Sequence, residues 1–298
     1  MITHNGIEAF LAVCRLKSMS RAAEELFLSQ SSLSVRIRTL ENELGTTLFL
    51  RKKGQREIAL TATGKEFFDI ALAYEKVTVK IEKLRRAHHE KLRVSSLNSL
   101  GAYILPESYA LFMEKYPETG LVIQDYAFYE ACKSILRGNT DLAFNVDNSV
   151  TNRIKAIPVF SEGFSLICAE SSSYPETVSA DMLSVKNEVY VDWYNGFNDY
   201  HTTVFGDELP PLCLDMMSQL KIFVEKPNNW AIVPTSVARG LVQNSDIRTV
   251  NAEFELPERT VYCLYSAEDE LTECSRMFLQ CLSAILKKKK EVTCLLDI

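Results

Sequence analysis

Residues 20–45, SRAAEELFLSQSSLSVRIRTLENELG, carry polar side chains at spacings that place them together on one side of a helix. A helix that follows Ser29 has one apolar stripe, formed by Leu33, Ile37, Leu40 and Leu44. The side chains pointing away from this stripe are Ser31, Ser34, Val35, Arg38, Thr39 and Asn42. Hydroxyl, amide and guanidinium groups on such a face suit hydrogen bonds to phosphates and base edges, so nucleic acid is a candidate ligand. If the face meets only water, the segment is an ordinary helical hairpin.

Val35 is the unusual member of this face, because folding gives no reason for an apolar side chain opposite the buried stripe. A valine here would suit contact with a thymine methyl group in a major groove. The alternative is a single exposed apolar residue without a function. The sequence leaves both interpretations open.

A second group of basic residues follows the predicted helix, in the segment TTLFLRKKGQREIALTATG. Two short apolar runs, residues 48–50 and 58–60, predict a two-stranded wing around a turn that contains Gly54. The basic residues near its tip are Arg51, Lys52, Lys53 and Arg56. Beside a DNA-reading helix they would contact phosphates, whereas a basic loop elsewhere is simply solvated.

The elements that must position these groups are three helices in the first 45 residues. Apolar residues from Ile7 to Cys14 predict a first helix that ends near Lys17. Ser18 or Ser20 is expected to cap a second helix, whose small buried residues allow close packing. Gly45 is expected to end the third helix.

A long helix is predicted from Thr61 to about residue 90. Its apolar residues repeat at alternating spacings of three and four, which is the seam of a coiled coil. They are Phe67, Ile70, Tyr74, Val77, Ile81 and Leu84. So narrow a stripe on a charged helix favours a second copy of the same helix as its partner, and the alternative is packing on its own domain.

These residues together resemble the winged helix-turn-helix of the LysR-type transcriptional regulators. The matching residues, in order, are Ser20, Ala22, Ala23, Leu26, Ser29, Gln30, Ser34, Ile37, Leu40, Glu41, Leu44, Gly45, Leu48, Phe49, Arg51, Leu60, Thr61 and Gly64. The resemblance implies that helix 29–44 enters the major groove with Gln30, Ser31 and Ser34 near base edges or phosphates. The family usually has Pro at position 31 and Arg at position 35, so Arg36 or Arg38 is expected to replace the missing contact at Val35.

From Lys91 onward, strands and helices alternate. The strands KLRVSSL, TGLVIQDYA and DLAFNV, with helices between them, predict a parallel βαβαβ sheet. A second set contains the strands GFSLICA, EVYVDW and WAIVP, and TVYCLYS with a helix at 270–290 ends the chain. Two α/β lobes resemble the periplasmic-binding-protein-like effector domain of the LysR family. GNTDLAF matches a family run, and NNWAIVP has Asn228 and Asn229 where the family has a glycine.

The candidate effector site is predicted beyond the carboxyl ends of these strands, because open α/β sheets bind ligands there. The candidate residues are Asn98, Ser99, Asn145, Asp147, Trp193, Tyr194 and Trp230. Backbone N–H groups and a serine hydroxyl at the helix start after Leu97 would suit a carboxylate effector. Asp147 would oppose an anion, so a zwitterionic or hydroxylated effector stays open.

Composition excludes several other classes. The chain has 298 residues and 47% hydrophobic content, enough for about two packed domains. Residues 1–90 hold 15 Lys and Arg against 11 Asp and Glu, whereas residues 91–298 hold 18 against 28, so a basic front precedes an acidic body. Eight scattered cysteines, no C-x-x-C and no metal-ligand spacing favour reduced thiols. No catalytic motif is recognised, and neither a targeting segment nor a membrane span is expected, which predicts a cytoplasmic protein that is not an enzyme.

The sequence therefore predicts a DNA-binding transcriptional regulator controlled by a small-molecule effector, with no cofactor or metal. The expected parts are a winged helix-turn-helix at 1–60, a linker and dimerisation helix at 61–90, and a two-lobed α/β effector domain at 91–298. Lobe I is expected at 91–160 and 268–298, and lobe II at 161–267. Expected partners are double-stranded DNA, a homodimer or homotetramer, and RNA polymerase as a further candidate. The alternative is a thiol-redox sensor on the same scaffold, using Cys213, Cys263, Cys274 or Cys281.

Overall fold

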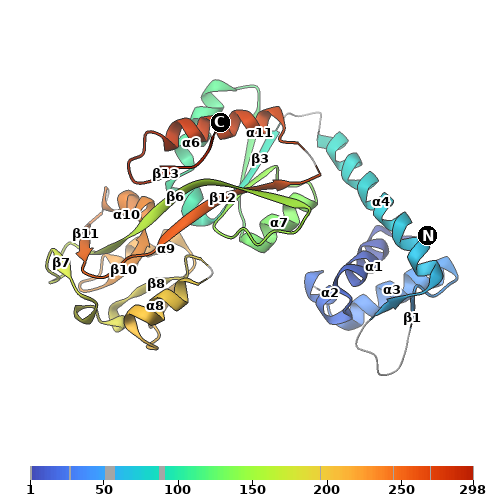
Figure 1. Ribbon diagram of the computed structural model, residues 1–298, viewed down its shortest axis with the longest axis horizontal. Helices are drawn as coiled ribbons and strands as arrows, with labels where there is room; N and C mark the ends of the chain where they lie inside the picture. The colour runs from blue at the N-terminus through green and yellow to red at the C-terminus, as the bar shows by residue number, and fades with distance from the viewer. Residues whose placement is uncertain are drawn as a thin grey trace. The chain divides into compact units, whose positions relative to one another are not determined.

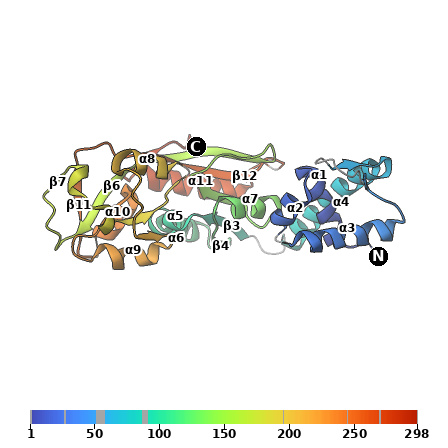
Figure 2. The ribbon, with the colours of Figure 1, turned by 90° about the horizontal axis from the view of Figure 1, so that it is seen from below.

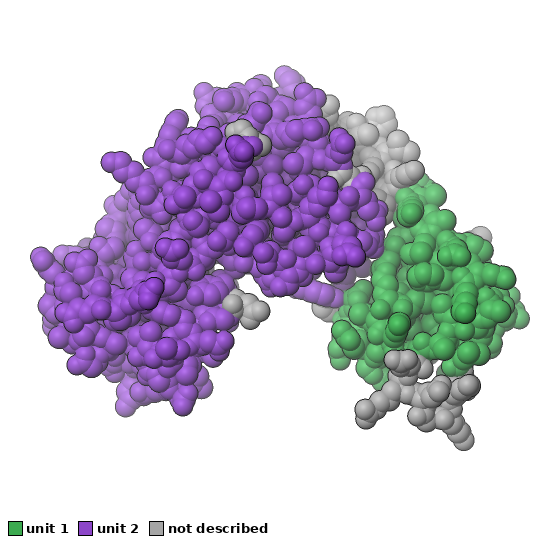
Figure 3. Space-filling view, in the orientation of Figure 1, with its two compact units in different colours: residues 1–85 green, residues 86–298 purple. Residues whose placement is uncertain are grey.

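The computed structural model describes residues 2–26, 28–50, 58–86, 91–194, 196–243, 245–268 and 270–297. Their helices and strands are shown in Figures 1 and 2. The chain divides into two compact units, residues 1–85 and 86–298, which are coloured separately in Figure 3. Within the described residues, no helix combines the length and the apolar character needed to cross a membrane.

Unit 1 begins with three helices whose ends follow local capping rules. They are α1 (His4–Leu16), α2 (Met19–Glu25) and α3 (Gln30–Leu44). Ser18 and not Ser20 caps α2, where its hydroxyl accepts a hydrogen bond from the N–H of Arg21. Gly45 ends α3 in the left-handed conformation, as predicted.

The remainder of unit 1 is a small sheet and one long helix. Strands β1 (Phe49–Leu50) and β2 (Ala59–Leu60) pair antiparallel, and α4 (Ala62–Arg86) follows. The core joins α1, β1 and α4, because the ring of Phe10 lies 5.3 Å from that of Phe49 and 5.0 Å from that of Phe67. Helix α3 adds its buried stripe, Leu33, Ile37 and Leu40, to the same core. The expected helix-turn-helix with a two-stranded wing is therefore present in this unit.

The first lobe of unit 2 is a parallel sheet with helices against it. Strands β3 (Lys91–Ser96), β4 (Gly120–Asp125) and β5 (Leu142–Asn145) are parallel, with β3 in the centre. The helices of this lobe are α5 (Asn98–Tyr103), α6 (Pro106–Lys115), α7 (Phe128–Leu136) and α11 (Glu273–Leu286). Helix α6 begins at Pro106, because proline suits the first helical turn.

Two long strands connect this lobe to the next. Strand β6 (Ile154–Ala169) pairs with β12 (Glu258–Ser266) as far as Gly163, and from Phe164 it pairs with strands of the second lobe. Figure 1 shows β6 and β12 running side by side. The sequence recognised only residues 163–169 of β6 as a strand. Because β6 belongs to both lobes, the lobe limits given above stay a prediction.

The second lobe is built on the far half of β6. Strands β10 (Trp230–Pro234) and β11 (Ile247–Ala252) pair antiparallel with it, and β7 (Thr177–Val178) pairs parallel with β11. Strands β8 (Val189–Val191) and β9 (Leu212–Leu214) form a separate parallel pair, and β13 (Thr293–Cys294) joins β6 in the first lobe. Helices α8 (Phe197–Phe205), α9 (Met217–Val224) and α10 (Thr235–Val242) pack in this lobe, with short 3-10 turns at Ala180–Met182 and Val185–Asn187.

The turn before β10 differs in sequence from the glycine turn that the resemblance suggested, yet it keeps a glycine-like backbone. Asn228 has a φ of 64°, in the left-handed region that asparagine tolerates better than most residues. Its side-chain oxygen accepts a hydrogen bond from the hydroxyl of Ser173, at 3.2 Å. Asn228 therefore takes the left-handed conformation that a glycine would have in this turn. Together with the strands and helices described above, the expected two-lobed α/β fold is present.

Candidate nucleic-acid interface and effector site

The outer face of α3 presents the residues that the sequence selected as DNA contacts. Gln30, Ser31, Val35 and Arg38 are exposed, and Ser34 and Arg36 are half-buried. Val35 is 58% exposed, so most of its surface is left open by the described residues of unit 1. The face therefore combines hydroxyl, amide and guanidinium groups with one apolar side chain.

The first turn of α3 is fixed by its own serines. The hydroxyl of Ser29 accepts a hydrogen bond from the N–H of Ser32 at 3.1 Å and lies 2.9 Å from the hydroxyl oxygen of Ser31. Ser20 of α2 donates to the side-chain oxygen of Gln30 at 3.4 Å. These contacts orient the polar groups at the N-terminus of α3, where backbone N–H groups also favour a phosphate.

Three further residues that match the family pattern hold the two-stranded wing against α3. The buried carboxylate of Glu41 accepts a hydrogen bond from the N–H of Leu48, at 2.8 Å. The hydroxyl of Thr61 donates to the carbonyl oxygen of Thr47 at 2.8 Å and accepts from the N–H of Gly64. A Cβ at Gly64 would lie 2.1 Å from the carbonyl oxygen of Leu48, so only glycine fits. Glu41, Thr61 and Gly64 therefore position the sheet and α4.

The basic tip of the wing lies outside the described residues. Arg51, Lys52, Lys53 and Arg56 fall within residues 51–57, and their predicted phosphate contacts stay predictions.

The seam predicted on α4 is largely uncovered in the single chain. Phe67 is buried in the core of unit 1, whereas Ile70, Tyr74, Val77 and Ile81 are exposed. The side chain of Leu84 lies outside the described residues. Among the seam positions whose side chains the structure describes, packing within unit 1 buries Phe67 and leaves the other four exposed, with the Tyr74 ring 6.0 Å from that of His4.

In unit 2, α5 brings the candidate residues Asn98 and Ser99 to the junction of the two lobes. The side-chain oxygen of Asn98 accepts a hydrogen bond from the N–H of Met217 on α9, at 3.3 Å. Its amide nitrogen donates to Asp125 at 2.7 Å. Tyr103 and Gly240 are also close, since a Cβ at Gly240 would lie 2.4 Å from the Tyr103 ring. Helix α5 of the first lobe therefore packs against α9 and α10 of the second.

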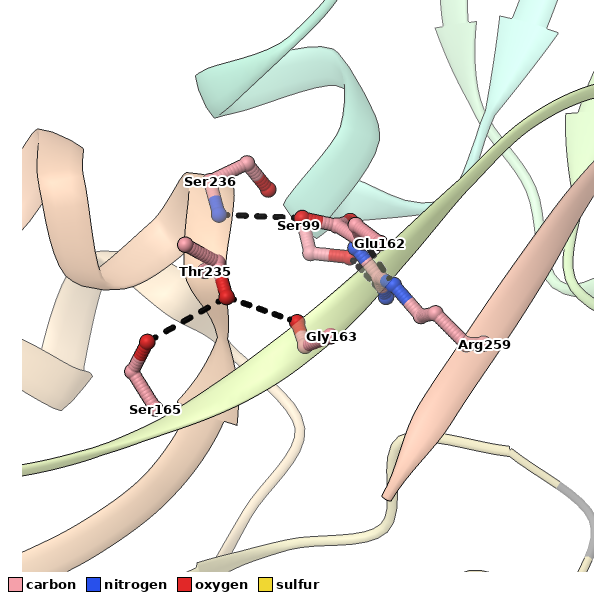
Figure 4. Close-up of polar contacts among 7 residues, drawn as sticks. All are labelled: Ser99, Glu162, Gly163, Ser165, Thr235, Ser236 and Arg259. Atoms are coloured by element: carbon pink, nitrogen blue, oxygen red, sulfur yellow. Dashed lines mark hydrogen bonds and ion pairs between the residues drawn. The ribbon is translucent and has the colours of Figure 1, made fainter. Parts of the chain in front are cut away.

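A buried ion pair occupies the same junction. Both Nε and Nη2 of Arg259 donate to Oε1 of Glu162, at 2.9 and 2.7 Å, and Nη1 donates to the hydroxyl of Ser99 at 3.4 Å. The other carboxylate oxygen, Oε2, accepts a hydrogen bond from the N–H of Ser236 on α10, at 2.9 Å. Figure 4 shows these groups converging from α5, β6, β12 and α10. The indole ring of Trp193 lies 5.8 Å from the guanidinium carbon.

We call Ser99, Glu162, Trp193, Ser236 and Arg259 the interlobe site. Burial lowers the pKa of the Arg259 guanidinium, and the adjacent Glu162 carboxylate opposes that change. Sequence reasoning selected Ser99 and Trp193 but missed the other three residues. The available signal was a single acid in the otherwise uncharged strand sequence FSEGFSLICA and a single arginine in RTVYCLYS, which contains no other charged residue.

The other candidate effector residues are placed differently. Tyr194 follows Trp193, and its ring packs 6.1 Å from Phe164. Asn145 is buried at the end of β5, where its side-chain oxygen accepts hydrogen bonds from the N–H groups of Val146 and Asp147. Trp230 is fully buried in the second lobe, and its indole N–H donates to the carbonyl oxygen of Ser184. The structure therefore brings Ser99 and Trp193 together around Arg259 and gives Trp230 a place in the core.

A second buried acidic group lies within the second lobe. Glu188 and His201 are both buried, and Oε2 of Glu188 lies 2.7 Å from Nε2 of His201. Burial raises the pKa of Glu188, although the contact with His201 lowers it in part. His201 is therefore packed inside the lobe.

The four cysteines of the redox alternative occupy different environments. Cys263 and Cys281 are buried, and burial raises the pKa of both thiols, which keeps them protonated and weakly nucleophilic. Cys213 is exposed on β9, and Cys274 is half-buried on α11. Across the described residues, no group of three or more His, Cys, Asp or Glu side chains could hold a metal ion.

Both units match known family models. The model described as "Bacterial regulatory helix-turn-helix protein, lysR family" matches residues 4–65. The model described as "LysR substrate binding domain" matches residues 85–287. Together these two matches cover most of the chain.

Individual relatives and solved structures agree with these matches. "Uncharacterized HTH-type transcriptional regulator YfeR" of Shigella flexneri is 28% identical over 174 residues, which are 56% of this chain and 55% of YfeR. A "Probable RuBisCO transcriptional regulator" of Phaeodactylum tricornutum is 35% identical over 137 residues, 44% of each protein. This chain therefore matches about half the length of those relatives. The structure of full-length OxyR C199D from Pseudomonas aeruginosa has a TM-score of 0.57 at 18% identity, covers 95% of this chain and 100% of that chain, and shows the shared fold.

Proposed function

The chain belongs to the lysR family of bacterial transcriptional regulators, and from this premise we propose that it binds double-stranded DNA through α3 and changes transcription when a small molecule binds between the two lobes of unit 2. The observation that carries the DNA-binding part is the outer face of α3. Its hydroxyl, amide and guanidinium groups are exposed, while Glu41 and Thr61 hold the adjacent sheet in place. Such a face can enter a major groove.

We propose specific roles on this face. Gln30, Ser31 and Ser34 contact base edges or phosphates near the N-terminus of α3, and Arg36 and Arg38 supply positive charge toward the backbone. Val35 lies among them as an apolar contact for a thymine methyl group. The basic residues of the wing, Arg51, Lys52, Lys53 and Arg56, contact phosphates beside the groove.

The proposed DNA binding is tested by footprinting on the DNA that adjoins the gene of this chain. We expect a protected region whose affinity falls steeply as salt rises, because each neutralised phosphate releases a counterion. A variant with Arg38→Ala should bind more weakly and show a smaller salt dependence. If no salt-sensitive protection appears on this DNA or on randomised sequences, the proposal is wrong.

We propose that two copies of the chain associate through α4. The exposed residues Ile70, Tyr74, Val77 and Ile81 form a stripe that a second α4 would cover. A dimer would present two copies of α3 to two half-sites, which is how helix-turn-helix proteins commonly read DNA. Sedimentation of the purified chain tests this, and a monomer at all concentrations would contradict it.

We propose the interlobe site as the place where the effector acts. It joins side chains from both lobes, and β6 and β12 pass through it, so a molecule bound there would change the geometry between the lobes. Thermal-shift screening of small molecules, followed by a structure of the complex, tests this placement. A stabilising effector that binds elsewhere in unit 2 would overturn it.

A further inference from the structure

The start of α10 depends on a carboxylate that comes from a distant part of the chain. Its N-cap residue is Pro234, which provides no side-chain hydrogen bond to the first turn. Instead, the N–H of Ser236 donates to Oε2 of Glu162, 74 residues earlier in the sequence. Glu162 therefore takes the place that a capping side chain or a bound anion would otherwise have at the start of this helix.

The second oxygen of Glu162 completes an anion site. Oε1 receives two hydrogen bonds from Arg259, and Arg259 in turn contacts the hydroxyl of Ser99. The carboxylate and the guanidinium are both almost completely buried. A guanidinium fork, a helix start and a serine are together the groups that proteins use to hold a carboxylate.

The same contacts remove the reason to expect an anionic effector at this point. With Glu162 in place, the positive charge of Arg259 is neutralised, and a second carboxylate would be buried close to the first. Repulsion between two such charges about 4 Å apart would weaken binding on the order of a thousandfold. Within the described residues, the hydroxyl of Ser236 is buried without a hydrogen-bond partner. A neutral hydroxyl or amide group, or a protonated amine, could satisfy it without repulsion from Glu162.

We infer that Glu162 is a built-in carboxylate ligand of the interlobe site, and that the effector of this chain is a neutral or cationic molecule instead of a carboxylate. This inference depends on one part of the proposed function, namely that the effector binds at the interlobe site. It replaces the carboxylate effector that the sequence suggested, because that expectation assumed that the groups at this junction were available to an external anion.

The experiment removes the internal carboxylate and supplies an external one. In Glu162→Ala, Arg259 is buried without its partner, so the unfolding temperature of the full chain should fall by roughly 10 °C. Acetate should restore part of this loss with a saturable concentration dependence, whereas equal ionic strength of chloride should not. Acetamide has nearly the same shape without the charge and serves as the matched probe. Wild-type protein should respond to acetate no more than to chloride.

Two further variants keep the test decisive. In Glu162→Ala with Arg259→Met, both charges are absent, so acetate should no longer stabilise the protein. Glu162→Gln retains the volume and leaves no room for acetate, so it should show no rescue and serves if Glu162→Ala does not fold. If Glu162→Ala does not fold, acetate is tested on the wild-type protein and on Glu162→Gln instead. Saturable stabilisation of either protein by acetate would contradict the inference.

The remaining outcomes also decide the inference. Saturable stabilisation of the wild-type protein by acetate would show that the site accepts an external carboxylate beside Glu162 and would overturn it. A folded Glu162→Ala protein that acetate cannot rescue would show that Glu162 does not occupy an anion site. Since none of these measurements contains DNA, their result is independent of whether the chain binds DNA.

Discussion

At the scale of single residues, the two units use their unusual side chains in opposite ways. Unit 1 exposes an apolar residue, Val35, within a polar face, whereas unit 2 buries the charges of Glu162, Arg259 and Glu188. Exposing a valine costs little, so function can select it without loss of stability. Burying a charged group costs free energy unless a partner compensates it. Arg259 and His201, the partners of Glu162 and Glu188, are therefore needed for the stability of unit 2.

We expect Val35→Arg to strengthen DNA binding. The new guanidinium would reach a phosphate or a guanine edge, which should raise affinity roughly tenfold. The slope of log affinity against log salt should steepen by about 0.9 if the contact is to a phosphate. Gel shifts at several salt concentrations measure both, and selection from random DNA reports a change in base preference.

The control for this prediction adds the same charge far from α3 in the sequence. Met113 is exposed on α6 of unit 2, so Met113→Arg should leave the salt slope unchanged. Equal behaviour of the two variants would place Val35 outside the DNA interface.

We expect Glu188→Gln to gain stability relative to wild-type as pH rises. Burial raises the pKa of Glu188 above the ordinary value of 4.5, so the folded state holds its proton more tightly than the unfolded state does. Wild-type stability is therefore reduced as pH rises through the raised pKa, and the penalty is fully present above it. The glutamine does not titrate and avoids this loss.

Urea unfolding at a series of pH values from about 4.5 to neutrality measures the difference between the two proteins. Glu208→Gln, at an exposed position, is the control and should show no such trend. A difference that shrinks with rising pH would mean that His201 stabilises the ionised carboxylate more than burial penalises it.

At the scale of elements, short-range contacts fix how α3, the small sheet and α4 fit together. The carboxylate of Glu41 holds the start of β1, and the hydroxyl of Thr61 joins the end of β2 to the segment before β1. Gly64 lets the first turn of α4 approach Leu48 directly. The orientation of the face that we propose for DNA contact thus depends on residues that lie away from that face.

Gly64→Ala should therefore destabilise unit 1. Its Cβ would lie 2.1 Å from a backbone oxygen, which cannot move aside like a flexible side chain, and we expect a cost of about 1–3 kcal/mol. Calorimetry would detect this as a lower unfolding temperature for unit 1, with weaker DNA binding. Gly163→Ala is the matched control, since the nearest atom to its Cβ is Thr235 Oγ1 at 4.0 Å. Equal costs for both variants would contradict the steric explanation.

At the scale of the whole molecule, the exposed stripe on α4 connects the fold of one chain to the assembly that we propose. The first seam residue, Phe67, is used by the core of unit 1, and the next four are exposed. An apolar row on a charged helix gains most from a second helix of the same kind. Dimerisation would also couple the two DNA-binding units to one event in unit 2.

We expect Val77→Glu to weaken this dimer at least tenfold, which corresponds to about 1.4 kcal/mol, because a charge would be buried in the seam. Analytical ultracentrifugation measures the dissociation constant. Lys76→Glu is the control, since it changes charge more strongly but lies outside the seam. If both variants dissociate equally, net charge and not the seam controls association.

The local features of this chain were predictable from the sequence. The ends of α3 at Ser29 and Gly45, the long helix α4 and the parallel strands β3, β4 and β5 follow from caps and periodicity, which depend on residues a few positions apart. The short elements α8, β9 and β11 were missed, because two or three turns or a few strand residues carry too little periodic signal. The continuity of β6 through both lobes was also missed.

Local patterns and ordered motifs along the chain were enough to predict the family and the two-lobed plan, and to select the face of α3 that we propose as the DNA contact. Only the tertiary structure decided which groups meet between the lobes. Glu162 and Arg259 are 97 residues apart, and they come into contact because β6 and β12 pair in the register that sets these two residues opposite each other. Strand pairing between distant segments depends on the whole arrangement of the sheet. Spacing along the chain could therefore identify Ser99 and Trp193, but it could not reveal that both contact Arg259 or that Glu162 neutralises this arginine.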